Sequence, residues 1–176
     1  MEIDLRWPVI FLANALLIAL VRMVNDALAP YGIYLVLTAL LLIVPALHLP
    51  PRWGILLSFG TALLYGAPYL DDITPLMFVF GLGYVIFRQF GSQLRRFRRA
   101  QLLTSLVVAN TLLVILQGFL FSDTNPGSNL VYMQRVVSDS LLSAVVLYPV
   151  GYWFIDLQYT CLVLLGVDPR ADDPPE

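Results

Sequence analysis

The sequence predicts an all-α membrane protein in which six transmembrane helices form one bundle. Three observations support this fold class. First, 59% of the 176 residues are hydrophobic and only 12% are charged, about half the charge that a soluble domain carries. Second, long apolar runs alternate with short polar breaks. Third, the charges are segregated, with arginines in some breaks and aspartates in others.

Six apolar runs give the expected helices. Tryptophan opens the first and third runs, where it would anchor a helix at the membrane interface. Proline and other turn residues mark the breaks, and the second run is close to the shortest length that spans a bilayer. The predicted helices cover residues 7–24, 32–48, 53–70, 73–90, 101–121 and 136–157 of a single domain, 1–167.

The C-terminal part of the chain contains two further segments. Tyr159–Val167 is apolar, and it either extends the sixth helix or turns to lie in the membrane interface. Asp168–Glu176 is acidic and rich in proline, a composition that predicts a disordered tail.

A dense basic cluster separates the fourth and fifth runs. It contains Arg95, Arg96, Arg98 and Arg99, and the chain has no lysine. The favoured interpretation is that a short cytoplasmic loop of this kind fixes the orientation of the helices. The alternative is a contact surface for an acidic partner or for anionic lipid headgroups.

The arginines also predict which side of the membrane each loop faces. With both termini in the cytoplasm, only Arg22 and Arg135 fall on the outer side, together with the acidic residues Asp71, Asp72 and Asp123. The cytoplasmic side then receives Arg6, Arg52, Arg88, Arg95, Arg96, Arg98, Arg99 and Arg170. This distribution is the one that the positive-inside rule expects.

Two charges lie inside apolar runs. Arg22 is near the outer end of the first helix and Asp139 near the outer end of the sixth, so they could form an intramembrane ion pair, or each could reach the outer headgroups separately. Asn14 and Asn110 are expected to hydrogen-bond to neighbouring helices.

A stripe of small residues marks the third predicted helix. Ser58, Ala62 and Gly66 recur at intervals of four residues. Small residues at this spacing let a second helix approach closely, which favours helix packing inside a membrane. The stripe therefore predicts a packed face.

The sequence contains little that resembles catalytic chemistry. It has one cysteine, Cys161, and one histidine, His48, which leaves no cysteine or histidine set for a metal. It also has no Walker motif and no glycine-rich nucleotide fingerprint. We therefore expect no enzyme activity, no cofactor, no metal and no nucleic-acid partner, and a small-molecule ligand is not expected.

From the second helix to the end of the sixth, the chain resembles the MreD family of bacterial rod-shape-determining membrane proteins. The resemblance depends on the order and spacing of several short features. These are Leu47-His48-Leu49-Pro50, then Arg52, then Phe59, Ala62 and Gly66, then Tyr84, then the basic loop with Gln101, and finally Val146-Leu147-Tyr148-Pro149.

The resemblance implies a fold, a role and partners. The fold would be a compact six-helix bundle similar to the substrate-binding subunits of energy-coupling-factor transporters. The role would be that of a non-catalytic scaffold of cell elongation in the bacterial inner membrane. Its partners would be the lipid bilayer, a single-span protein such as MreC and, through it, peptidoglycan synthases and an actin-like filament. The alternative is a substrate-binding subunit of a vitamin transporter.

Overall fold

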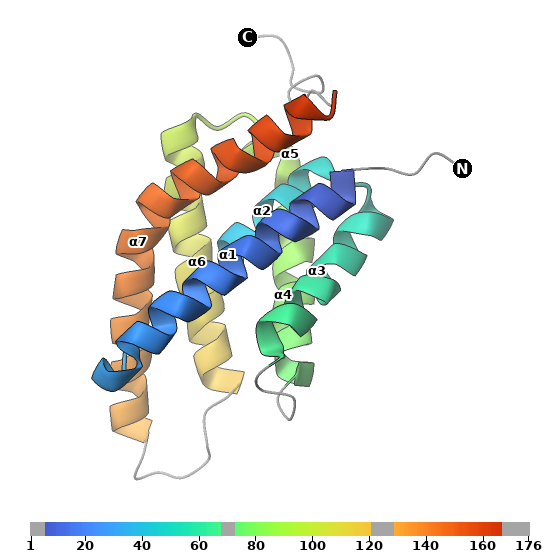
Figure 1. The fold of residues 1–176 in the computed structure, drawn as a ribbon. Helices are drawn as coiled ribbons and strands as arrows, with labels where there is room; N and C mark the ends of the chain where they lie inside the picture. Colours follow the sequence, from blue (N-terminus) through green and yellow to red (C-terminus); the bar gives the residue numbers. More distant parts are fainter. Residues whose placement is uncertain (1–5, 68–72, 121–128, 167–176) are drawn as a thin grey trace.

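The computed structural model of the chain describes residues 6–67, 73–120 and 129–166. All regular elements within these ranges are helices (Figure 1). They are α1 Arg6–Leu28, the 3-10 helix η1 Ala29–Tyr31, α2 Thr38–His48, α3 Pro51–Gly66, α4 Ile73–Gln89, α5 Gly91–Leu94, α6 Arg99–Leu120 and α7 Asn129–Leu164.

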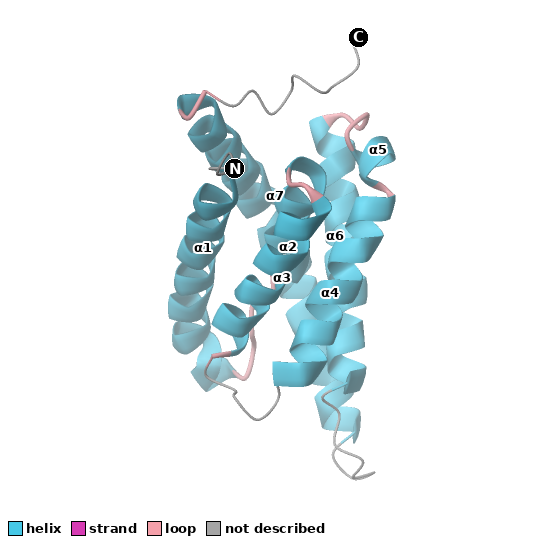
Figure 2. Cartoon of the chain, turned by 90° about the vertical axis from the view of Figure 1, so that its right-hand side faces the viewer, coloured by secondary structure: helices cyan, strands magenta, loops and turns pink. Residues whose placement is uncertain are grey.

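Helix α2 is the centre of the bundle. Every residue from Thr38 to Leu47 is buried, and the other long helices surround it. Figure 1 shows α1 crossing in front of α2, with α3 and α4 on one side and α6 and α7 on the other. The sequence colours of Figure 1 show the long helices running alternately in opposite directions, and the view from the side shows them packed side by side (Figure 2). A short helix that is apolar all round is stable in such a place because no face has to meet water.

Among the described residues, three helical segments are long and apolar enough to cross a membrane: Arg6–Tyr31, Arg99–Leu120 and Tyr132–Leu164. Helices α2 and α4 are apolar but shorter. The predicted class, an all-helical membrane protein, is confirmed at this level.

The second predicted helix begins too early. The sequence predicted helix from residue 32, but α2 begins at Thr38. Gly32 adopts a left-handed conformation with φ of 68°, and residues 33–37 have no regular structure. Glycine takes this conformation without the steric cost that a Cβ atom would bring. We call residues 33–37 the irregular segment.

The last helix is longer than predicted. Helix α7 begins at Asn129 rather than at residue 136, and it continues through Tyr159 to Leu164. The apolar segment after residue 157 therefore extends the helix as far as Leu164. Pro149 lies inside α7, and the helix bends partway along its length in Figure 1, as expected where proline removes a backbone hydrogen bond. The predicted acidic tail, 168–176, lies outside the described residues.

Helix α3 also has shifted limits, because it begins at Pro51 and ends at Gly66, whereas the prediction began at residue 53. The last predicted positions, 68–70, lie outside the described residues. Pro51 occupies the first helical position, where its missing N–H costs nothing. The two tryptophans predicted to anchor helices lie together: the rings of Trp7 and Trp53 stack with their centroids 5.7 Å apart. This contact joins the beginnings of α1 and α3.

Candidate functional site

The irregular segment lies inside the bundle, so its backbone polar groups need partners that water would otherwise supply. Helix α1 supplies the first of them. The Asn25 side chain accepts a hydrogen bond from the Leu35 N–H at 2.7 Å and donates one to the Leu35 carbonyl at 3.0 Å. One side chain thus satisfies both backbone groups of a buried residue.

Helix α7 supplies the next two partners. The Asp139 carboxylate accepts a hydrogen bond from the Tyr34 N–H at 2.7 Å. One turn further along, the Ser143 hydroxyl accepts one from the Val36 N–H at 2.9 Å. Asp139 and Ser143 therefore hold two alternate N–H groups of the irregular segment.

Helix α6 supplies the remaining partners of the irregular segment and also caps the beginning of α2. Asn110 is buried; its Nδ2 donates to the Val36 carbonyl at 2.7 Å and its Oδ1 accepts from the Ala39 N–H at 3.1 Å. The first N–H groups of a helix have no partner within it, so Asn110 caps α2 from a distance. Gln117 adds a hydrogen bond to the Thr38 hydroxyl at 3.2 Å.

Arg22 and Asp139 do not form the possible ion pair in the described structure, where both residues have other partners. Arg22 donates to the carbonyls of Leu64 and Tyr65 at the end of α3, where the helix dipole favours a cation. Asp139 binds the irregular segment, and its Oδ2 lies 3.9 Å from the Arg135 Nε. The depth of both charges favoured a pair, but nearer partners compensate each of them.

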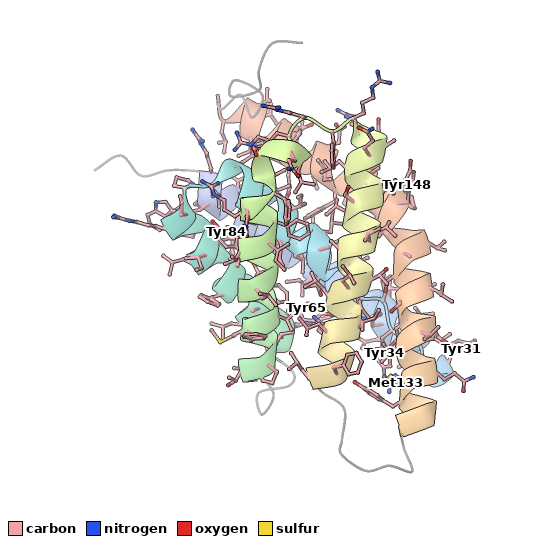
Figure 3. All side chains as sticks on the ribbon, turned by 180° about the vertical axis from the view of Figure 1, so that it is seen from behind. Tyr31, Tyr34, Tyr65, Tyr84, Met133 and Tyr148 are labelled. Atoms are coloured by element: carbon pink, nitrogen blue, oxygen red, sulfur yellow. The ribbon has the colours of Figure 1, made fainter. Side chains whose placement is uncertain are left out.

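A cavity of about 420 Å³ lies beside the irregular segment. Its wall combines apolar side chains with a few polar groups, and the Arg135 guanidinium lies 4.4 Å from the centroid of the Tyr34 ring. Figure 3 shows Tyr34 and Tyr65 in the same half of the bundle, away from Tyr84. The lining residues are Tyr34, Val36, Tyr65, Leu76, Val114, Gln117, Gly118, Tyr132, Arg135, Val136 and Asp139.

The middle of the bundle holds a second polar network around Asn14. Pro45 has no N–H, so the Leu41 carbonyl lacks its usual helical partner. Asn14 takes that place, with its Nδ2 3.0 Å from the Leu41 carbonyl oxygen. The same amide reaches the Thr61 hydroxyl at 3.3 Å and accepts from Gln158 at 3.2 Å. Asn14 and Asn110 thus bond to neighbouring helices, as the sequence predicted.

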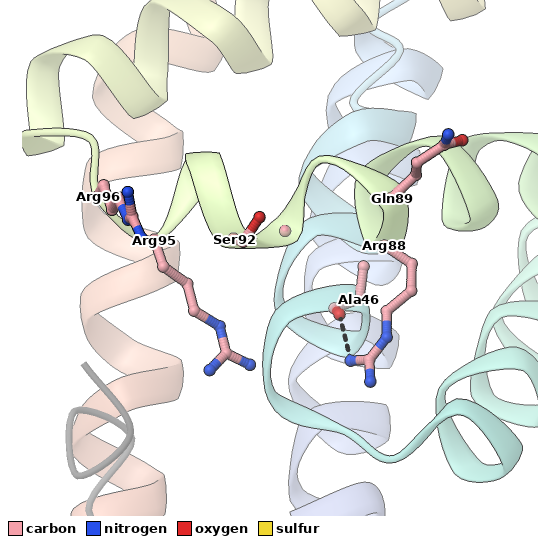
Figure 4. A pocket seen from close by; sticks show the side chains of 7 residues that line it. Ala46, Arg88, Gln89, Ser92, Arg95 and Arg96 are labelled. Carbon is pink, nitrogen blue, oxygen red and sulfur yellow. Dashed lines mark hydrogen bonds between the residues drawn. The ribbon is translucent and has the colours of Figure 1, made fainter. Parts of the chain in front are cut away.

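Two arginines hold the other end of α2. Arg88 donates from Nη1 to the Ala46 carbonyl at 3.0 Å and to the Leu49 carbonyl at 3.1 Å. Arg95 donates to the Leu47 carbonyl. The last carbonyls of a helix need such partners and attract a cation. Figure 4 shows the first of these hydrogen bonds.

The four arginines predicted as a partner or lipid contact therefore have different environments. Arg95 is half-buried against α2. Arg99 forms a 3.2 Å ion pair with Asp156, with both side chains half-exposed, where such a pair adds little stability. Arg96 and Arg98 are exposed, which leaves them accessible to a ligand or partner.

The small-residue stripe lies in a packed face within this chain. Ser58, Ala62 and Gly66 are all buried, and a Cβ at Gly66 would meet a leucine of α4 at 2.8 Å. Gly54, which the sequence analysis did not single out, continues the stripe, because a Cβ there would lie 2.4 Å from the Tyr84 hydroxyl. The stripe therefore brings α3 against α4.

Within the described residues, no three His, Cys, Asp or Glu side chains form a group that could hold a metal. Comparison with protein-family models, curated proteins and solved structures gave no match. Fold and site together define an all-helical membrane protein whose buried polar side chains bond to its own backbone and to one another.

Proposed function

We propose that the chain is a non-catalytic scaffold of the bacterial cell-elongation machinery, spanning the inner membrane six times with both termini in the cytoplasm. The observation that carries the proposal is the use of the buried polar residues. Asn14, Asn110 and Ser143 are buried and Asn25 is half-buried. Each of the four hydrogen-bonds to backbone groups of another segment. These side chains build the bundle, and this use favours a protein that acts through its surfaces.

The resemblance to the MreD family supplies the particular role. Two of the residues that carry it, His48 and Tyr84, make contacts at the end where α2 stops and α3 begins. The Tyr84 hydroxyl donates to the Pro51 carbonyl at 3.4 Å, and His48 lies 3.0 Å from the Tyr159 hydroxyl. The Tyr84 feature thus contacts Pro51, which lies between the Leu47–Pro50 feature and Arg52, and this contact supports the significance of their order.

The proposed orientation is supported by the direction of the helices. In Figure 1, α1 begins and α7 ends at the same end of the bundle. The arginines of α4, of α6 and of the loop between them lie at this end as well. A reporter fused after residue 168 should be active in the cytoplasm, and periplasmic activity would contradict the orientation.

Depletion of the protein in its own rod-shaped host tests the proposed role. We expect the cells to become round, and we expect a single-span MreC-like protein to co-purify with the chain from mild detergent. Retention of the rod shape, or recovery of transporter ATPase subunits in place of the MreC-like protein, would refute the scaffold function.

The cavity beside the irregular segment favours a second candidate function, the substrate-binding subunit of a vitamin transporter. An apolar cavity of about 420 Å³ with a few polar groups has the size and character of a small-molecule site. Here a single vitamin should raise the thermal midpoint of the purified protein. Val114→Phe, which fills the cavity, should remove that shift, and a full panel of vitamins without effect would exclude this function.

A further inference from the structure

A basic cavity of about 380 Å³ lies at the arginine-rich end of the bundle, between the end of α2 and the segment around α5 (Figure 4). Three of its seven lining residues are arginines and none is acidic. The lining residues are Ala46, Arg88, Gln89, Gly91, Ser92, Arg95 and Arg96. We call it the basic cavity.

Two of these arginines are held in place by neutral partners. Arg88 and Arg95 donate to backbone carbonyls at the end of α2. A carbonyl carries no formal charge, so these hydrogen bonds do not offset the positive charge of either guanidinium. A guanidinium has five N–H donors, and in Arg88 the bonds to α2 come from Nη1, which leaves the donors on Nη2 and Nε for another acceptor.

The third arginine adds a charge that the described residues do not balance. Arg96 is exposed and forms no ion pair with a described acidic residue. At this end Asp156 pairs with Arg99, which lies outside the cavity. Three arginines thus line one cavity without a carboxylate from the described chain. Charge-assisted bonds from such a group suit phosphate oxygens.

We propose that the basic cavity binds a phosphate group, either the headgroup phosphate of an anionic phospholipid or a soluble phosphate. Basic pockets between helices at a membrane surface recognise anionic headgroups in this way. The proposal assigns distinct tasks to neighbouring arginines: Arg88, Arg95 and Arg96 face the ligand, and Arg98 does not.

Arg96 and Arg98 provide a matched pair for the test. Both are exposed, they lie in the same loop, and neither side chain bonds to α2 as Arg95 does, so Arg96→Gln and Arg98→Gln should both fold. The thermal midpoint of the full chain in detergent is measured against short-chain phosphatidylglycerol, phosphatidylcholine of the same length, and inorganic phosphate.

Phosphatidylglycerol should raise the midpoint more than phosphatidylcholine does. Arg96→Gln should raise the phosphatidylglycerol concentration needed for a given midpoint shift about five-fold, the equivalent of the ~1 kcal/mol that one basic side chain contributes near an anionic surface. Arg98→Gln should leave this concentration unchanged. A similar, Arg96-dependent effect of inorganic phosphate alone would identify a soluble phosphate as the ligand. An effect of phosphatidylglycerol alone would identify a lipid headgroup.

Two results would overturn the proposal. One is an equal response to both lipids together with no response to phosphate. The other is an equal loss in Arg96→Gln and Arg98→Gln, because this would indicate a diffuse attraction to the whole loop and no site in the cavity.

Discussion

Replacing Asn110 by leucine should destabilise the bundle strongly, although leucine is apolar and close in size. Asn110 is buried, with 1% of its surface exposed. Its side chain bonds to the Val36 carbonyl at 2.7 Å and to the Ala39 N–H at 3.1 Å. Leucine offers neither a donor nor an acceptor, so both backbone groups lose their partner at once.

The size of the effect depends on whether the backbone finds new partners. An average side-chain hydrogen bond in a membrane protein contributes only about 0.6 kcal/mol, because the broken groups usually do find others. Here Asp139 and Ser143 hold the neighbouring N–H groups, which prevents the irregular segment from rewinding into a helix. Each orphaned group should then cost about 1–3 kcal/mol, and we expect a total loss of at least ~2 kcal/mol.

Unfolding in mixed micelles with increasing SDS measures this loss as a free energy. Thr111→Val, at the next position of α6, is the matched control. The Thr111 hydroxyl donates to the Val107 carbonyl at 3.0 Å, but that carbonyl keeps its helical partner when the hydroxyl is removed. A loss in Asn110→Leu no larger than in Thr111→Val would refute the reasoning.

Three further predictions use the same assay. Asn14→Leu should cost less in a Pro45→Ala background, because alanine restores a helical N–H to the carbonyl that Asn14 now serves, and the coupling should reach about 0.5 kcal/mol or more. Arg22→Gln and Asp139→Asn should have additive effects, because the two residues have separate partners. Ala62→Leu should cost about 1–3 kcal/mol, because the site is fully buried against other helices.

Each of these predictions has a control or a contrary result. Leu56→Ile, on the exposed face of α3, should leave stability unchanged and serves as the control for Ala62→Leu. Unchanged stability in Ala62→Leu would place the stripe against lipid. Equal costs of Asn14→Leu in both backgrounds would deny the link to Pro45, and strong coupling between Arg22 and Asp139 would restore the predicted ion pair.

Local pattern was enough to predict much of this fold. Apolar runs interrupted by polar breaks predicted an all-helical membrane protein, and three helical segments of the described residues are long and apolar enough to cross a membrane. The same pattern indicated that Asn14 and Asn110 would bond to neighbouring helices, since an amide inside an apolar run has few other partners. Both do so in the structure.

The irregular segment could not be predicted from its own sequence. Residues 33–37 are apolar, so a helix was the natural prediction. Asn25 is only 10 positions from its partner Leu35, but the other groups that hold this segment, Asn110, Asp139 and Ser143, lie 71 to 107 positions away in the chain. The partners of Arg22 could not be predicted for the same reason. They are carbonyls left free at the end of α3, and the sequence does not show where in space a helix ends.

The positions of these partners in the chain also determine when the irregular segment can form its hydrogen bonds during synthesis. A chain emerges from the ribosome N-terminus first, and Asn25 is already present when Leu35 appears. Asn110 follows much later, and Asp139 and Ser143 come only with the last helix. The N–H groups of Tyr34 and Val36 therefore lack their final partners until the last helix enters the membrane. Until then they are unpaired or bonded to the translocon or to water. The hydrogen bonds of the N-terminal part are thus complete only after the C-terminal helix has been synthesised.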